Sequence, residues 1–96
     1  MDRAKIITAL QQFRQNRSEQ FQVLEMALFG SVAREEASDA SDVDIAVRTK
    51  TADPYNIVHL KEALEEHLHL RVDIVRLRDQ MNPRLKKRIE HEAIYV

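Results

Sequence analysis

The chain of 96 residues contains no cysteine, which excludes disulfides, thiolate catalysis and cysteine-ligated zinc. Glycine occurs once, as Gly30, so we expect it where the backbone is unusual or approaches another group closely. No apolar run approaches the roughly 20 residues of a membrane span. The N-terminal segment also lacks the apolar core of a signal peptide. We therefore expect a cytoplasmic protein without membrane contact.

The chain also has no excess of positive charge. Lys and Arg number 15 against 16 Asp and Glu, which gives a formal net charge of −1. Nucleic acid is therefore not expected as a direct partner. With 44% hydrophobic and 32% charged residues, the composition is that of a globular protein. The length predicts a single domain over residues 1–96.

Apolar periodicity predicts the elements of the first half of the chain. Apolar residues at helical spacing predict an amphipathic helix over residues 2–16, ended by the polar stretch 15–18. The apolar run 23–29, which stops at Gly30, favours a strand that is largely buried on both faces, and a helix is the alternative. Residues 31–37 then predict a short helix with Ser31 as its N-cap.

The second half is predicted from strand alternation, from prolines at helix starts and from enrichment in β-branched residues. These signals give a strand at 42–47, a helix from Pro54 capped by Asp53, a strand at 71–77, a helix opened by Asn82 and Pro83, and a short terminal strand at 93–96. The main order is helix, strand, short helix, strand, helix, strand, helix. It predicts an α+β fold in which helices cover a small mixed sheet.

Asp42 and Asp44 stand at positions i and i+2 of a predicted strand, so their side chains share one face. Their Cα atoms would lie roughly 6.5 to 7 Å apart. Two carboxylates so close repel each other in a partly dry site, and a divalent cation such as Mg²⁺ relieves that repulsion. The alternative is an exposed strand end with two solvated acids.

Asp73 lies between Val72 and Ile74 in the next predicted strand, where a charge is unusual without a partner. If the two strands are neighbours, Asp73 can reach Asp42 and Asp44. The alternative is a charge that protects an edge strand from aggregation.

Gly30 and Ser31 connect a predicted buried strand to a helix start. Such a turn brings backbone N–H groups close to a ligand, and it suits phosphate. An ordinary turn is the alternative.

Together these residues resemble a known signature. Gly30-Ser31-Val32-Ala33-Arg34, seven further residues and then Asp42-Val43-Asp44 are similar to the motif of the DNA polymerase β-type nucleotidyltransferase superfamily. The short chain resembles the minimal nucleotidyltransferase (MNT) branch, and Ser41 also matches the usual form. Glu35 departs from it, because glycine is frequent at that position, and this leaves the local loop path open.

The resemblance implies a polymerase β palm-like fold and a set of site residues. Gly30 and Ser31 would hold the triphosphate of ATP. Asp42 and Asp44 would bind two Mg²⁺ ions, and Asp73 would complete the metal site and help activate the acceptor hydroxyl. Arg34 would either contact phosphate or form a surface ion pair with Asp39 or Glu36.

The MNT resemblance also implies a partner. Members of this branch resemble antitoxins of HEPN-domain toxins, so the expected reaction is transfer of AMP from ATP to a toxin tyrosine. Two alternatives stay open: an antitoxin that neutralises its HEPN partner by binding alone, with a vestigial site, and a transferase acting on an antibiotic or on RNA.

Two further features are assigned to the surface. The four histidines (His59, His67, His69 and His91) lack the spacing of a zinc hydrolase motif and are expected at helix ends or on the surface. Residues 84–88 form a basic stretch, which is interpreted as the solvated face of the last helix. The alternative is a docking surface for an acidic partner or RNA.

Overall fold

The computed structural model describes residues 2–96 and contains four helices and four strands in this part of the chain. In chain order they are α1 (Arg3–Phe21), β1 (Val23–Phe29), α2 (Gly30–Ala33), β2 (Val43–Thr49), α3 (Pro54–Leu68), β3 (Val72–Arg76), α4 (Pro83–Glu92) and β4 (Ile94–Tyr95). The short terminal strand is confirmed, because Tyr95 and Ile94 pair with β1.

The four strands form one mixed sheet in the order β3-β2-β1-β4. β1 is antiparallel to β2 and to β4, whereas β2 and β3 are parallel. A parallel neighbour requires a crossover connection, and α3 provides it between β2 and β3. The predicted α+β class with a small mixed sheet is confirmed.

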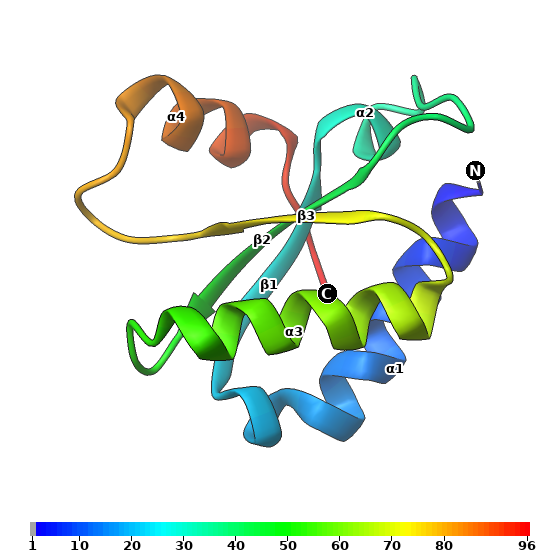
Figure 1. The fold of residues 1–96 in the computed structure, drawn as a ribbon. Helices are drawn as coiled ribbons and strands as arrows, with labels where there is room; N and C mark the ends of the chain where they lie inside the picture. The colour runs from blue at the N-terminus through cyan, green and yellow to red at the C-terminus, as the bar shows by residue number, and fades with distance from the viewer. Residues whose placement is uncertain (1) are drawn as a thin grey trace.

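Helices cover both faces of the sheet (Figure 1). α1 and α3 lie side by side on one face, where they bury the larger part of the core, including Leu10, Ile45 and Leu64. α4 lies over the other face, where Ile89 packs on Phe29 and Ala46. Nothing in residues 2–96 forms a helix both long and apolar enough to cross a bilayer.

The predicted end of the first helix was wrong. α1 continues through the polar stretch to Phe21 and stops at Gln22, which adopts a left-handed conformation with φ 56°. The extension is stabilised by packing that the local sequence does not reveal. The ring of Phe21 stacks on Phe13 with centroids 6.0 Å apart, and the Arg17 guanidinium lies over both rings.

The predicted bounds of the second helix were also wrong. α2 spans only Gly30–Ala33, and Phe29 occupies the N-cap position without a side-chain cap bond. Ser31 therefore lies inside the helix and is not its N-cap. The helix ends early because Glu35 turns into the left-handed region with φ 59°. This is the position where the MNT motif often has glycine, the residue that adopts this conformation most easily.

β1 is buried on both faces only from Met26 to Phe29. Leu24 is 45% exposed, because it lies beyond the end of the neighbouring strand β4.

The predicted starts of the two later helices are confirmed by their caps. Asp53 accepts from the Tyr55 N–H at 2.9 Å at the start of α3, and Asn82 accepts from the Arg84 N–H at 2.9 Å at the start of α4.

The core position Leu64 provides a test of this packing. Leu64 is fully buried on α3, whereas Val58 on the same helix is 53% exposed. Leu64→Ala should lower the free energy of unfolding by about 2–5 kcal/mol, because it leaves a cavity beneath the sheet. Val58→Ala is the matched control and should change it by less than about 0.5 kcal/mol. Urea denaturation followed by circular dichroism measures both, and equal effects would contradict the assigned burial.

Candidate active site

Two of the three predicted aspartates meet on neighbouring strands. Asp44 on β2 and Asp73 on β3 are direct partners in the parallel register. Side chains of register partners emerge on the same face of a sheet. This is the face that α4 covers, because Ala46 and Val75, two residues further along each strand, pack in the cluster around Ile89.

Asp42 lies one residue before β2, so the strand begins slightly later than predicted. It keeps its i, i+2 relation to Asp44. Its carboxylate, however, is paired with Arg71, whose Nε lies 3.2 Å from Oδ1. The Arg71 guanidinium also donates to the backbone oxygen of Ala40 at 2.8 Å. Arg71 thus ties the loop before β2 to the start of β3.

Gly30 packs directly against Asp44. Its backbone has φ +76°, in the left-handed region. A Cβ atom at this position would lie 2.1 Å from Asp44 Oδ2 and 2.9 Å from its Cγ. Both observations explain why the one glycine of the chain stands here. Gly30 and Asp44, which are 14 positions apart in the sequence, therefore lie in one site with Asp73.

Sequence reasoning missed Glu92, the last residue of α4. Its Oε2 accepts the Gly30 N–H at 3.0 Å, and its Oε1 accepts from Arg34 Nη1 at 2.8 Å. Arg88, one turn earlier on α4, approaches the same Oε1 at 3.5 Å. The i, i+4 spacing of Arg88 and Glu92 was the available signal. It predicts a helical ion pair, but not that the pair reaches the glycine turn.

Arg34 forms one of the two ion pairs considered from the sequence. Its Nε lies 3.0 Å from Glu36 Oε2, and Nη1 binds Glu92. The pKa of Arg34 is raised further by its hydrogen bonds to Glu36 and Glu92, so the guanidinium remains charged. Ser31, the other predicted phosphate contact, sits half-buried in α2 beside Gly30. Phosphate binding by either residue stays a prediction.

The charges of the site act on Asp44. Its pKa is raised, chiefly because burial disfavours the carboxylate, and next because of the negative charge of Asp73. Asp42 adds to this increase, whereas Arg88 and Arg34 oppose it. Asp44 therefore carries a charge that its surroundings only partly compensate.

Glu92 shows the opposite balance. Burial by itself would raise its pKa, but the Gly30 N–H and the charges of Arg34 and Arg88 outweigh burial and lower it. Glu92 is thus held ionised within this group of donors.

A cation suits the chemistry of the aspartates, although the carboxylates are not assembled as a cage. Within residues 2–96, no three acidic or histidine side chains converge closely enough to form a metal-binding group. Asp44 and Asp73 supply the oxygen ligands that Mg²⁺ prefers, and their mutual repulsion is relieved by positive charge. Asp42 could join them if it exchanged its ion pair with Arg71 for the metal. The metal-ligand assignment of all three stays a prediction.

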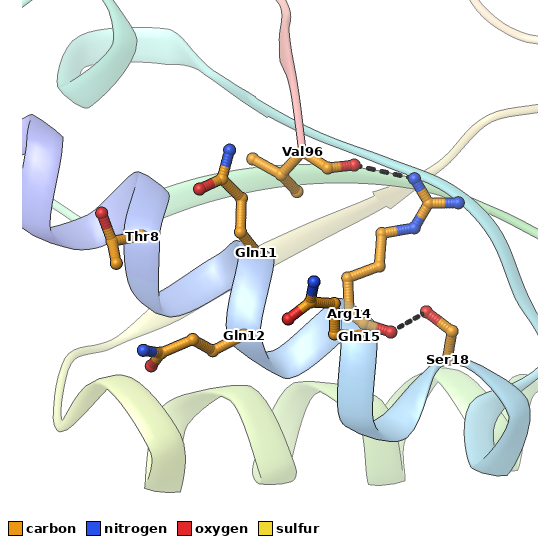
Figure 2. Close-up of a pocket in the computed structure, with 7 residues that line it drawn as sticks. All are labelled: Thr8, Gln11, Gln12, Arg14, Gln15, Ser18 and Val96. Carbon is orange, nitrogen blue, oxygen red and sulfur yellow. Dashed lines mark hydrogen bonds between the residues drawn. The ribbon is translucent and has the colours of Figure 1, made fainter.

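A hollow of about 680 Å³ lies along α1 (Figure 2). None of the three predicted aspartates lines it. Neutral polar side chains and Arg14 dominate its lining, and Arg14 donates to the backbone oxygen of Val96 at 2.7 Å. None of its lining residues has a carboxylate side chain, which distinguishes it from the aspartate site.

Comparison with known proteins gives consistent matches. Residues 7–96 match the family described as polymerase beta, nucleotidyltransferase. The protein adenylyltransferase MntA of Thermococcus cleftensis is 38% identical over 79 residues, which cover 81% of this chain and 79% of that protein. A Methanocaldococcus jannaschii protein assigned as a protein adenylyltransferase is 39% identical over 79 residues, 81% of each chain.

Solved structures are similar over nearly the whole chain. One that is assigned as a minimal nucleotidyltransferase has a TM-score of 0.80 at 35% identity and covers 98% of this chain and 95% of that one. A toxin–antitoxin structure with AMP-PNP has a TM-score of 0.71 at 27% identity, covering 99% and 72%. A complex of tri-AMPylated Shewanella oneidensis HEPN toxin with MNT antitoxin has a TM-score of 0.60 at 25% identity, covering 98% and 67%.

The raised pKa of Asp44 predicts a pH-dependent effect of Asp44→Asn. Between the ordinary value of 3.8 and the raised pKa, the folded state binds more protons than the unfolded state. The contribution of this carboxyl to stability therefore falls as pH rises through that window. Without divalent cations, Asp44→Asn should raise the free energy of unfolding at neutral pH, and the gain should vanish below about pH 3.8.

Urea denaturation across that pH range measures the difference between variant and wild type. Asp39→Asn in the exposed preceding loop is the control and should show no such pH-dependent gain. A gain that persists or grows in acid would contradict the raised pKa of Asp44.

Proposed function

The chain belongs to the polymerase beta nucleotidyltransferase family, and from this we propose that it is an antitoxin that transfers AMP from ATP to a tyrosine of a HEPN-domain toxin. Its relatives are named protein adenylyltransferases. The structural neighbours include an MNT antitoxin bound to a tri-AMPylated HEPN toxin and a toxin–antitoxin structure with AMP-PNP. A cytoplasmic location follows from this proposal, because ATP and the toxin would meet there.

The observation that carries the proposal is the contact of the glycine turn with the aspartate pair. Gly30 lies against Asp44, and Asp44 is the register partner of Asp73. Nucleotide transfer requires hydrogen-bond donors for the leaving pyrophosphate, and these must lie next to the groups that hold the reacting α-phosphate. The contact of Gly30 with Asp44 supports this proposal, because it places the glycine turn next to the aspartates.

The proposed roles follow from position. Asp42, Asp44 and Asp73 would hold two Mg²⁺ ions, which when bound would stabilise the negative charge of the phosphates and lower the pKa of the acceptor hydroxyl. Ser31 and the Gly30 turn would bind the triphosphate. Arg34 keeps Nη2 outside its ion pairs with Glu36 and Glu92, so this nitrogen would be available to a phosphate oxygen.

In the proposed reaction one P–O bond forms and another breaks. The tyrosine oxygen of the toxin attacks the α-phosphorus of ATP and forms a new P–O bond. The bond from the α-phosphorus to the bridging oxygen of the β-phosphate breaks, and pyrophosphate leaves with that electron pair. Asp73, which is exposed on β3, would accept the tyrosine proton and pass it to water.

The mutation of both β2 aspartates tests this function. Asp42→Ala with Asp44→Ala should reduce labelling of the HEPN partner by α-labelled ATP at least about 100-fold, because metal ligands are removed. Chelation of Mg²⁺ should have the same effect on the wild type. Scintillation counting and intact mass of the toxin measure the transfer, and Asp39→Ala is the matched control.

The same double variant distinguishes enzymatic from contact-only neutralisation. Loss of both labelling and neutralisation, with the fold retained by circular dichroism, would support transfer as the antitoxin mechanism. Neutralisation without labelling would favour binding alone, and full labelling by the double variant would refute the assigned site.

A further inference from the structure

The carboxylate of Glu92 binds three groups, two of which lie far from it in the sequence. Gly30 and Arg34 come from the turn after β1, 62 and 58 residues before it, whereas Arg88 comes from the same helix. Both carboxylate oxygens are used. The side chain of Glu92 is only 18% exposed, so these contacts are partly shielded from solvent.

The hydrogen bond from Gly30 replaces a missing cap. The first N–H groups of any helix lack partners within it, and Phe29 at the N-cap position of α2 has no acceptor side chain. Glu92 Oε2 satisfies the first of these donors from the end of α4. A charged acceptor makes this bond stronger than a neutral cap would.

Gly30 is consequently fixed from two sides. Glu92 binds its N–H, and the Asp44 carboxylate occupies the space on the side where a Cβ atom would project. The distance between the glycine turn and the aspartate pair therefore depends on Glu92 as well as on the strands. If Glu92 were removed, the turn could move away from Asp44 without breaking a strand hydrogen bond.

Glu92 also orients Arg34 without using all of its donors. It accepts from Nη1, Glu36 accepts from Nε, and neither of these bonds uses Nη2. Phosphate can therefore bind Arg34 while Glu92 stays in place. A carboxylate that occupied every Arg34 donor would instead compete with phosphate.

We infer that Glu92 is a positioning residue for nucleotide transfer, which sets the glycine turn and Arg34 at the distance from Asp44 that a bound triphosphate needs. The inference rests on the proposed function. Glu92 touches neither of the reacting atoms; it acts through Gly30 and Arg34.

The single glycine gives a direct probe of this contact. Protein labelled with ¹⁵N-glycine shows one amide resonance, that of Gly30. In E92A, exchange of this amide proton should accelerate at least about tenfold relative to wild type. In E92Q, which retains an acceptor oxygen, most of the protection should remain. Glu90→Ala, on the exposed side of α4, is the control and should leave the resonance unchanged.

Measurements of nucleotide binding then distinguish a positioning role of Glu92 from a purely structural one. The Kd for AMP-PNP with Mg²⁺, and the KM for ATP, should rise roughly tenfold in E92A. E92Q should show a rise of about two- to fivefold, and the kcat of both variants should stay within about threefold of wild type. E92Q carries the test if E92A does not fold.

Three outcomes would overturn the inference. An unchanged Kd in E92A with faster Gly30 exchange would make Glu92 structural only, and a tighter Kd would make it a competitor of phosphate. The same Kd for E92Q and wild type would also refute it. If wild type binds and transfers nucleotide in these cases, the proposed function stands; if wild type binds none, both fall.

Discussion

The parallel register of β2 and β3 places Asp44 directly beside Asp73, and the rest of the candidate site is arranged around this pair of like charges. The strands cannot separate to relieve the repulsion, because Ile45 and Val72 are buried in the core beneath them. Burial raises the pKa of Asp44, and the negative charge of Asp73 raises it further. A rigid sheet thus maintains the negative charge density that binding of a cation and of a triphosphate would use.

Gly30 connects the aspartates to the end of α4. Its backbone lies between the carboxylate of Asp44 on β2 and that of Glu92 on α4. Two acids therefore approach one glycine for different reasons: one fills the space that a side chain would need, and the other accepts the backbone N–H. The turn that carries Ser31 and Arg34 is positioned by tertiary contacts, because α2 is too short to hold it.

Much of the fold was predictable, because its signals are local. The alternation in β2, the caps Asp53 and Asn82, and the β-branched residues of β3 each act within a few residues, and the structure confirms them. The end of α1 was not predictable in this way. The polar stretch 15–18 suggested a stop, but stacking of Phe21 on Phe13 and the position of Arg17 over both rings extend the helix.

The sequence alone determined the types of chemistry present: one glycine before a serine, two aspartates at strand spacing, and a third in a later strand. These follow from residue identity and from the two-residue period of a strand. Only the tertiary structure decided that Asp73 adjoins Asp44, that Asp42 pairs with Arg71, and that Glu92 reaches Gly30 from 62 residues away. Such contacts depend on strand order and helix packing, which are properties of the whole chain and leave no local pattern.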